Sequence, residues 1–283
     1  MDKVISGGFA IGRRQPWSRD YVRVVSWNVE RGLRFSAILD FLRTAEADLI
    51  LLQEVDLKAR RTQHRDVAHE LARSLQLNYV FGTEFLELGG GSGRSPAQHG
   101  QATLSPWPLW NGRIIRFEHQ SNFWKPRWYI PQIELFQRRL GGRIALVTEA
   151  MIYNQRLVTY NLHLESKGND TLRLQQLRET LKDAGRHTAS SVVIVGGDLN
   201  LDAGNGAVAA ALHGAGFHDA VRLPEIATTT RLPFQRARCI DWIYVSEGVG
   251  TDGQIHNTIG VSDHYPVSVT LPKQSPADAH LIV

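Results

Sequence analysis

Apolar and polar positions in the first part of the chain follow the strand period and the helix period in turn. Residues 21–29 alternate and are rich in valine, which predicts a strand. Residues 35–47 place apolar side chains at helical spacing on one face, so they predict an amphipathic helix. The aliphatic run Leu49–Leu52 predicts a buried strand, and residues 65–77 predict a second amphipathic helix. This succession of strands and helices is typical of the α/β class.

The rest of the chain continues the same alternation. Residues 143–153 and 157–164 predict a β-hairpin that turns at Asn154–Gln155. The remaining expected elements are, in chain order, a helix at 170–184, a strand at 192–195, a helix at 207–212, and strands at 240–245 and 265–271. The glycines of Gly89–Gly93 predict an exposed loop, and residues 107–131, rich in tryptophan and proline, predict strands broken by long loops.

One domain is expected, at residues 21–272. A length of 283 residues with 42% hydrophobic and 21% charged residues provides ample material for a single core. The polar clusters described below extend from residue 28 to residue 264 with no linker between them. Residues 1–20 are expected to form a flexible lead-in, and residues 273–283 a frayed tail.

Composition narrows the compartment and the partners. The single cysteine, Cys239, allows no intrachain disulfide, and no apolar stretch approaches the roughly 18 residues of a membrane span. Both features favour a cytoplasmic protein, and a monomer is the default expectation. Lys and Arg number 32 against 28 for Asp and Glu, and the resulting net charge of +4 suits an anionic substrate without identifying it.

Almost every predicted strand ends in a short cluster of Asn, Asp, Glu or His. These clusters are Ser26–Glu30, Leu52–Asp56, Asn161–Glu165, Gly196–Asn200, Ile240–Trp242 and Ser262–His264. In α/β proteins the strand bodies are buried and the chemistry is presented at the strand ends. We therefore expect one oxygen-rich site for a metal ion and a phosphate, assembled from segments along the whole chain.

Glu54, Asn28 and Asp263 are candidate ligands of a metal ion. Glu54 follows an aliphatic run, and a carboxylate at a buried strand end is costly unless it is paired or bound to metal. Hard oxygen donors of this kind favour Mg²⁺ or Mn²⁺ over zinc. A salt bridge between Glu54 and a nearby arginine is the competing interpretation.

Other clusters carry residues suited to proton transfer and phosphate binding. Asp198 can accept a proton from water while Asn200 fixes the geometry, although both residues also suit a plain β-turn. Asp241 and His264 form a candidate couple, because a carboxylate bonded to one ring nitrogen fixes the tautomer of a histidine and raises its basicity. His163 is a candidate phosphate ligand or, alternatively, a half-buried structural histidine.

The order of the clusters resembles the endonuclease/exonuclease/phosphatase superfamily over residues 21–272. The motifs that carry this resemblance are SWNVE, LLQEVD, HGQATLS, YNLHLE, GGDLN, IDWIYV and SDHYPV. Each motif alone is weak, but all of them in this order are specific. The resemblance implies a four-layer α/β sandwich with two central mixed β-sheets flanked by helices. It also implies Mg²⁺-dependent hydrolysis of phosphoester bonds.

The resemblance implies roles for individual residues as well. It implies catalytic roles for His163, Asp198, Asn200, Asp241 and His264, with Asp198 and Asn200 orienting the attacking water. It implies substrate contacts for Asn28, His163 and Asn200. It implies metal-side positions for Asn28, Glu30, Glu54 and Asp263. Arg143 and Gln176 match positions whose role is mostly structural.

A nuclease acting on DNA or RNA is the leading interpretation of the function. A nuclease needs a basic groove with stacking aromatic side chains. Candidates for this groove are Arg60, Arg61, Arg65, Trp124, Lys125, Arg127 and Trp128. His163 stands where abasic-site DNA endonucleases have a tyrosine, so a role in abasic-site repair is disfavoured.

Two other functions are weighed against the nuclease. The first is a phosphatase or phosphodiesterase acting on small or lipid phosphates, and an apolar rim at Phe123–Trp124 and Trp128–Tyr129 would suit a lipid. The second is a binding module without activity. Such a module is disfavoured because Glu54, Asp198 and His264 are all present.

Overall fold

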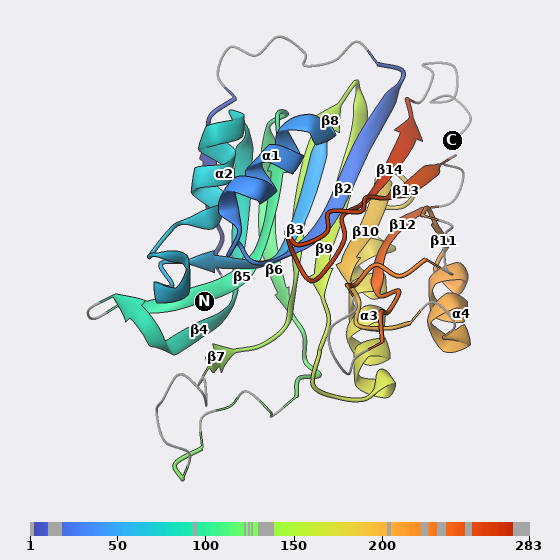
Figure 1. Ribbon diagram of the computed structural model, residues 1–283. Coiled ribbons are helices and arrows are strands. Elements are labelled where there is room, and N and C mark those ends of the chain that lie inside the picture. Colours follow the sequence, from blue (N-terminus) through green and yellow to red (C-terminus); the bar gives the residue numbers. More distant parts are fainter. Residues whose placement is uncertain are drawn as a thin grey trace.

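Two β-sheets form the centre of the molecule in the computed structural model (Figure 1). The structure describes residues 3–10, 19–92, 95–121, 123, 125, 127–129, 139–202, 205–221, 226–230, 236–246 and 251–273. The first sheet has the strand order β1-β4-β5-β3-β2-β14-β13, with β7 paired to β4, and the second has the order β11-β12-β10-β9-β8-β6.

The strands of the first sheet are β1 (Ile5–Gly8), β2 (Tyr21–Arg31), β3 (Leu49–Leu57), β4 (Asn78–Ser92), β5 (Ser95–Ser105), β7 (Arg139–Gly141), β13 (Asp252–Ile255) and β14 (Val267–Pro272). Those of the second are β6 (Leu109–Arg116), β8 (Ile144–Ile152), β9 (Gln155–His163), β10 (Val192–Asp198), β11 (Phe217–Asp219) and β12 (Asp241–Ser246). The helices are α1 (Phe35–Ala45), α2 (Val67–Leu75), α3 (Asp170–Ala184), α4 (Gly206–Gly214) and the short 3₁₀ helix η1 (Arg60–Thr62).

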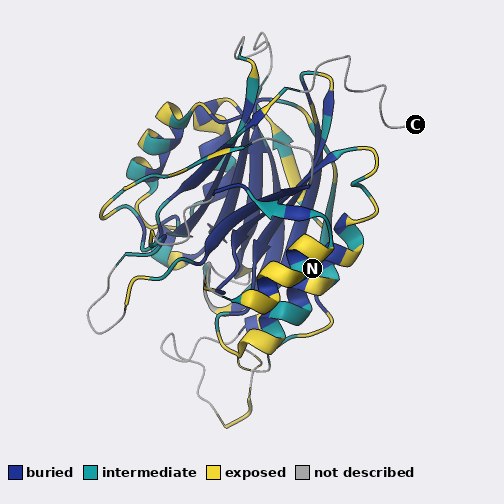
Figure 2. Ribbon diagram, turned by 90° about the vertical axis from the view of Figure 1, so that its right-hand side faces the viewer, coloured by how far each residue is buried: buried dark blue, intermediate teal, exposed yellow. Residues whose placement is uncertain are grey.

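Each sheet lies between the other sheet and a layer of helices, with α1 and α2 on one outer side and α3 and α4 on the other (Figure 1). Val24 and Leu51 of the first sheet pack against Ile194 of the second in a central core. The next residues along these strands point the other way, so Val25 packs in the core beneath α1 and α2. Figure 2 shows the strands almost wholly buried and the helices exposed on one side only.

Burial on both faces explains why the strands read as continuous apolar runs, as in other sheets covered on two sides. The structure confirms the predicted four-layer α/β sandwich. It also confirms the β8–β9 hairpin, although the turn lies at Tyr153–Asn154, one residue earlier than predicted, where both residues have left-handed backbone. No helix among the described residues has the length and apolar character needed to cross a membrane.

Two expectations about the chain need correction. Ile5–Gly8, inside the expected flexible lead-in, forms the edge strand β1 and pairs with β4. The glycine-rich residues Gly89–Gly91 belong to β4, and the β4–β5 hairpin extends to the pair Ser92 and Ser95. Glycine weakens a strand, and the β4–β5 register is irregular over this stretch, between the pairs Glu87–Ala97 and Ser92–Ser95.

Candidate active site

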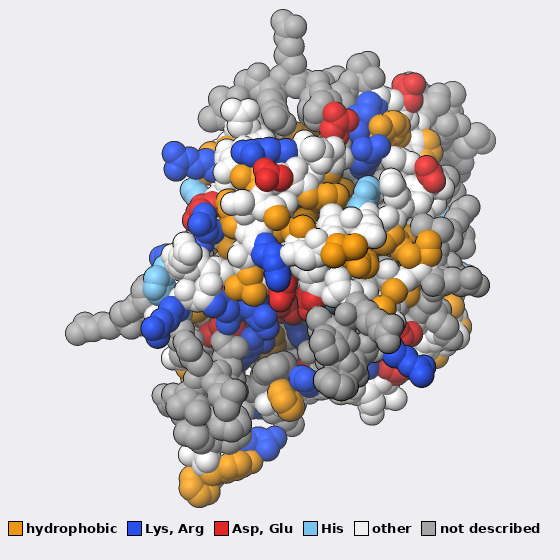
Figure 3. All heavy atoms as spheres, in the orientation of Figure 1, with side chains coloured by type: hydrophobic (Ala, Val, Ile, Leu, Met, Phe, Trp, Pro, Cys, Tyr) orange, Lys and Arg blue, Asp and Glu red, His pale blue; other side chains and the backbone are white. Residues whose placement is uncertain are grey.

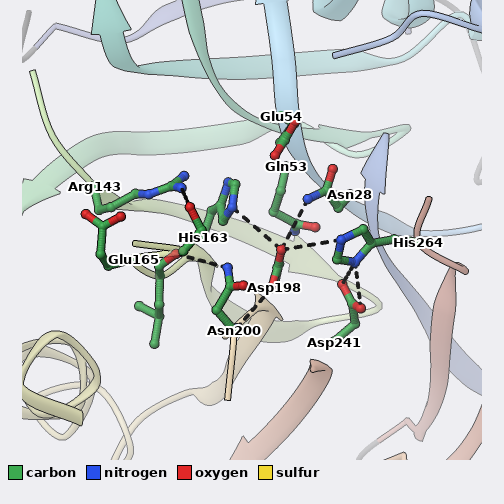
Figure 4. Close-up of polar contacts among 12 residues, drawn as sticks. Asn28, Gln53, Glu54, Arg143, His163, Glu165, Asp198, Asn200, Asp241 and His264 are labelled. Carbon is green, nitrogen blue, oxygen red and sulfur yellow. Dashed lines mark hydrogen bonds and ion pairs between the residues drawn. The ribbon is translucent and has the colours of Figure 1, made fainter. Parts of the chain in front are cut away.

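The strand ends that carry the predicted residues meet at one end of the sandwich. In the second sheet, the register places Asp198 of β10 directly beside His163 of β9 on one side and Asp241 of β12 on the other. In the first sheet, β2 and β3 run parallel and deliver Asn28 and Glu54 to the same end. Figure 4 shows these side chains turned toward one another across the boundary between the sheets.

Asp198 is the centre of this group. Its Oδ2 atom accepts a hydrogen bond from Nδ2 of Asn28 at 3.2 Å and lies 3.6 Å from Nε2 of His163 and 3.8 Å from Nε2 of His264. Burial raises the pKa of Asp198 to about 6, although the neighbouring His264 works in the opposite direction. A carboxylate with such a pKa is suited to general-base catalysis near neutral pH.

The expected couple of Asp241 and His264 is present. Nδ1 of His264 lies 2.8 Å from Oδ2 and 3.0 Å from Oδ1 of Asp241. The hydroxyl of Thr228 donates to the same Oδ2 atom at 2.6 Å. Burial disfavours the charged ring, but Asp241 and Asp198 outweigh it and raise the pKa of His264 to about 10. His264 is therefore an imidazolium whose Nε2–H faces Asp198.

His163 has a second acidic neighbour, which the sequence analysis did not identify. Nδ1 of His163 lies 3.9 Å from Oε1 of Glu84, a fully buried residue of β4, and this nitrogen makes no hydrogen bond among the described residues. Burial and the positive charge of Arg143 hold the pKa of His163 well below its usual range. Burial raises the pKa of Glu84 to about 7, against the opposing effect of Arg143. Asp198 therefore lies between a neutral and a charged histidine.

Glu54 is placed by irregular backbone in two neighbouring strands. The β2–β3 register shifts between Asn28 and Arg31, and the β3–β5 register shifts between Leu52 and Val55. Within these shifts Glu30, Arg31 and Glu54 all have left-handed φ values, of 45°, 66° and 51°. Such backbone is strained for residues other than glycine and is found where a bulge redirects a side chain at a functional site.

Two hydrogen bonds hold Asn200, one donated by its backbone and one donated by its side chain. Its N–H donates to Oδ1 of Asp198 at 2.9 Å, and its side-chain Nδ2 donates to the carbonyl of Leu164 at 3.2 Å. The φ of Asn200 is 52°, a left-handed value that asparagine tolerates better than most residues. The backbone turn at Asn200 thus also fixes the position of Asp198. The β-turn interpretation and the catalytic interpretation of this cluster are therefore compatible.

The four residues expected on the metal side differ in what their side chains contact. Glu54 lies near Asn28 in Figure 4, and its Oε2 is 3.9 Å from Nη2 of Arg31. The carboxylate of Glu30 instead pairs with Arg34 at 2.8 Å. Asp263 is partly buried, and its Oδ1 lies 3.4 Å from the hydroxyl of Ser262.

The donor chemistry fits a hard divalent cation at Glu54 and Asn28. The Glu54 side chain is 22% exposed and lies beside the positive charge of Arg31. Burial works to raise the pKa of Glu54, but the positive charges of Arg31 and Arg143 oppose it and that pKa is lowered, so the group is an anion. Among the described residues, a second group of possible ligand atoms is formed by Asp198, Asp241 and His264, all within 4.8 Å of one another.

A further set of buried charges next to Glu54 also escaped the sequence analysis. Asp56 binds Arg61 at 2.6 Å and Nδ1 of His99 at 3.0 Å, and Glu87 binds Arg61 at 2.7 Å and Arg139 at 2.9 Å. Burial lowers the pKa of His99 to about 3, so the ring is neutral. The only signal in the sequence was the HGQATLS motif, which contains His99.

The comparison with known proteins agrees with this geometry. The sequence model of the Endonuclease/Exonuclease/phosphatase family matches residues 25–264. The chain belongs to this family. Members of the endonuclease/exonuclease/phosphatase family are metal-dependent phosphoester hydrolases, and this chain is an enzyme of that class. A search of curated protein sequences returned no match.

Solved structures share the fold of this family member at low sequence identity. An endonuclease/exonuclease/phosphatase from Beutenbergia cavernae has a TM-score of 0.68 at 19% identity, covering 90% of this chain and 72% of that one. SmcL has a TM-score of 0.65 at 16% identity, covering 89% and 99%. TDP2 from D. rerio, solved with a single-strand DNA product, has a TM-score of 0.62 at 19% identity, covering 90% and 100%.

Proposed function

We propose that this protein is a Mg²⁺-dependent phosphodiesterase that hydrolyses DNA or RNA. The observation that carries the proposal is the position of the Asp198 carboxylate, which lies between the ring nitrogens of His163 and His264 and is held by Asn28. A base placed between two groups that can bind phosphate oxygens is the arrangement needed for attack of water on phosphorus.

Each of these residues has a definite task in the proposed reaction. Asp198 orients the attacking water and accepts its proton. His264, held by Asp241, places a positive charge where the phosphorane oxygens become more negative, and the uncharged His163 contributes a hydrogen bond there. Asn28 and Asn200 are the expected substrate contacts, although their amide nitrogens already donate to Asp198 and to the carbonyl of Leu164.

Glu54 and Asn28 would hold the metal ion, with Glu30 and Asp263 as more distant contributors. Glu30 would first have to leave its ion pair with Arg34. A bound Mg²⁺ supplies a Lewis acid that neutralises the charge on a phosphate oxygen. The oxygen donors of this set favour Mg²⁺, and Mn²⁺ is expected to replace it.

Nucleic acid as the substrate has two lines of support. The protein carries a net charge of +4, and D. rerio TDP2, which shares the fold, was solved with a single-strand DNA product. Two arginines of the expected basic groove already form ion pairs within the protein. Arg61 pairs with Asp56 and Glu87, and Arg65 pairs with Glu70. Trp124, another expected contributor, lies outside the described residues.

A lipid phosphodiester is the second candidate substrate, because exposed aromatic residues occur on the segment beyond β6. The exposed fractions are 58% for Phe123, 93% for Trp128 and 58% for Tyr129. Aromatic side chains with basic neighbours are typical of proteins that contact the membrane interface. Lys167 lies 5.6 Å from the Phe123 ring centroid and provides one such neighbour.

A substrate panel tests the proposal. Single-stranded DNA, double-stranded DNA, RNA, bis(4-nitrophenyl) phosphate and phospholipid vesicles should each be incubated with Mg²⁺, with Mn²⁺ and with a chelator. We expect cleavage of a polynucleotide that the chelator abolishes. Hydrolysis of vesicles without any cleavage of nucleic acid would replace the first candidate by the second, and full activity in chelator would refute the metal requirement.

A further inference from the structure

Four arginines lie around Glu54 and the nearby Asp56, and three of them are held by close carboxylate pairs. Arg61 makes contacts of 2.6 and 2.7 Å with Asp56 and Glu87, Arg139 makes one of 2.9 Å with Glu87, and Arg143 makes one of 3.0 Å with Glu84. The side chains of Arg139 and Arg143 are 5% and 3% exposed. Their guanidinium groups are part of the buried scaffold.

Arg31 differs from these three arginines in pairing and in exposure. Its closest described acidic contact is the 3.9 Å separation from Oε2 of Glu54, and 34% of its side chain is exposed. A guanidinium offers five N–H donors, and most of those of Arg31 have no described acceptor. Figure 3 shows Lys and Arg side chains beside a group of acidic side chains at the lower centre of this face.

The backbone directs Arg31 to the site and not to the core. Arg31 has a φ of 66° at the end of the register shift, where it pairs with Val55, the residue after Glu54. The shift therefore presents Arg31 and Glu54 together at the strand ends. A left-handed backbone at arginine costs free energy, and the register shift between β2 and β3 holds Arg31 in it.

We propose that Arg31 forms a second anion subsite, which binds a phosphate group next to the scissile one. The ligand class is a phosphodiester strand with at least two phosphates, so this inference rests on the proposed function and narrows its substrate. Arginine suits the task because its planar fork binds two phosphate oxygens at once. The group that enters the catalytic centre is separate, since Asp198, His163 and His264 surround that position.

The competing role for Arg31 is structural, as the partner that holds the Glu54 carboxylate. Such a role would lower the stability of an Arg31 variant and would change the hydrolysis of every substrate equally. A phosphate-binding role would instead affect substrates according to how many phosphates they carry. The two roles therefore differ in their dependence on substrate and on salt.

Binding of a labelled single-stranded DNA decanucleotide tests the inference without any turnover. Fluorescence anisotropy should be measured in chelator over a series of NaCl concentrations. Loss of one charge-assisted contact in Arg31→Gln should weaken binding about tenfold. It should also reduce the slope of log affinity against log salt by about 0.7, the value for one phosphate of a single strand. Arg31→Lys should keep the slope and recover only part of the affinity, because lysine binds as a point charge.

Arg43→Gln is the matched control, since Arg43 is an exposed arginine near the other end of α1 and pairs with Asp40. It should bind the decanucleotide as the wild-type protein does. Thermal melting checks that each variant folds, and Arg31→Asn replaces Arg31→Gln if the latter does not, because asparagine tolerates left-handed backbone. Equal binding by Arg31→Gln and Arg43→Gln, or no binding by the wild-type protein, would overturn the inference.

Hydrolysis of bis(4-nitrophenyl) phosphate, which has a single phosphate, is measured in parallel. Arg31→Gln should raise KM for the decanucleotide several-fold more than KM for this ester. Equal changes in both KM values would favour the structural role and contradict the subsite. If the wild-type protein hydrolyses neither compound, the proposed function fails, while the binding measurement still decides the role of Arg31.

Discussion

Nδ1 of His264 and Oδ2 of Asp241 are 2.8 Å apart, and both side chains are almost fully buried. The contact fixes the ring so that Nε2 faces Asp198, and the Thr228 hydroxyl fixes the carboxylate in turn. Thr228, Asp241 and His264, from three nearby segments of the chain, therefore determine where one imidazole N–H points. Most of the expected behaviour of this enzyme follows from that arrangement.

Asp241→Asn should lower kcat by about 10²–10³, because the loss of a preorganised electrostatic partner has an effect of this size. The amide keeps the shape of the carboxylate but no longer holds His264 as an imidazolium. Steady-state kinetics on the cleaved substrate measure the effect, and circular dichroism checks the fold. Asp252→Asn, at an exposed position of β13, is the control and should behave as the wild-type protein. Activity of Asp241→Asn within threefold of wild type would contradict the assignment of the couple.

The raised pKa of His264 should make the free energy of unfolding depend on alkaline pH. In the unfolded chain the ring loses its proton near pH 6.5, whereas in the folded protein it does so near pH 10. The stabilisation is therefore complete below pH 6.5 and declines as the pH rises toward 10. Each pH unit in this window should cost up to about 1.4 kcal/mol.

Urea unfolding at several pH values between 8 and 9.5 measures this dependence. The wild-type protein should lose stability more steeply than His264→Gln, which lacks the titrating group. Other groups that titrate in this range are present in both proteins and cancel in the comparison. Parallel curves for the two proteins would show that His264 is not held as an imidazolium.

Glu54→Gln should raise the concentration of Mg²⁺ needed for half-maximal activity by at least about tenfold, because the amide removes the anionic ligand. The shift in melting temperature on addition of Mg²⁺ gives a second readout that does not require turnover. Glu118→Gln changes an exposed glutamate and is the control. An unchanged metal requirement in Glu54→Gln would place the cation elsewhere, with Asp198, Asp241 and His264 as the next set to test.

Gly197 precedes Asp198 and cannot carry a side chain in this backbone. Its φ is 141°, and an added Cβ would lie 1.9 Å from the carbonyl oxygen of Leu162 in β9. Gly197→Ala should therefore destabilise the protein by about 3 kcal/mol or more and displace Asp198, so that activity falls as well.

Gly214→Ala is the matched comparison, since nothing lies within 4 Å of an added Cβ at the end of α4. It should leave stability unchanged or raise it by about 0.4–1 kcal/mol. Chemical denaturation of the two variants decides the matter. A mild effect at Gly197 would mean that β9 and β10 can separate at the site, which the close approach of their backbones argues against.

The polar clusters at strand ends could be predicted from the sequence because parallel neighbours bring their carboxyl ends, and antiparallel neighbours their first residues, to the same edge of a sheet. Asp198, His163, Asp241 and His264 were found in this way. Glu84 could not be found, because it lies inside β4, where nothing in the local pattern separates a site carboxylate from an ordinary strand residue. Its meaning depends on a neighbour from the other sheet, and packing between sheets is not encoded in local periodicity.

The ion pairs around Glu54 could not be predicted from the sequence either. The competing interpretation of Glu54, a salt bridge to arginine, is present as the long contact with Arg31. The bulges that bring these two residues together depend on the alignment of three strands, which composition and spacing do not reveal. The glycine-rich part of β4 was misjudged for a related reason, since the pairs Glu87–Ala97 and Ser92–Ser95 on either side of the glycines extend the hairpin past them.

The indole N–H of Trp27 donates to the backbone carbonyl of His264, and these residues are 237 positions apart in the chain. A ribosome that has synthesised the first two hundred residues has therefore made Asn28, Glu54, His163 and Asp198, but it has not yet made the histidine that completes the site. A chain that stops before residue 264 lacks one of the two histidines that flank Asp198.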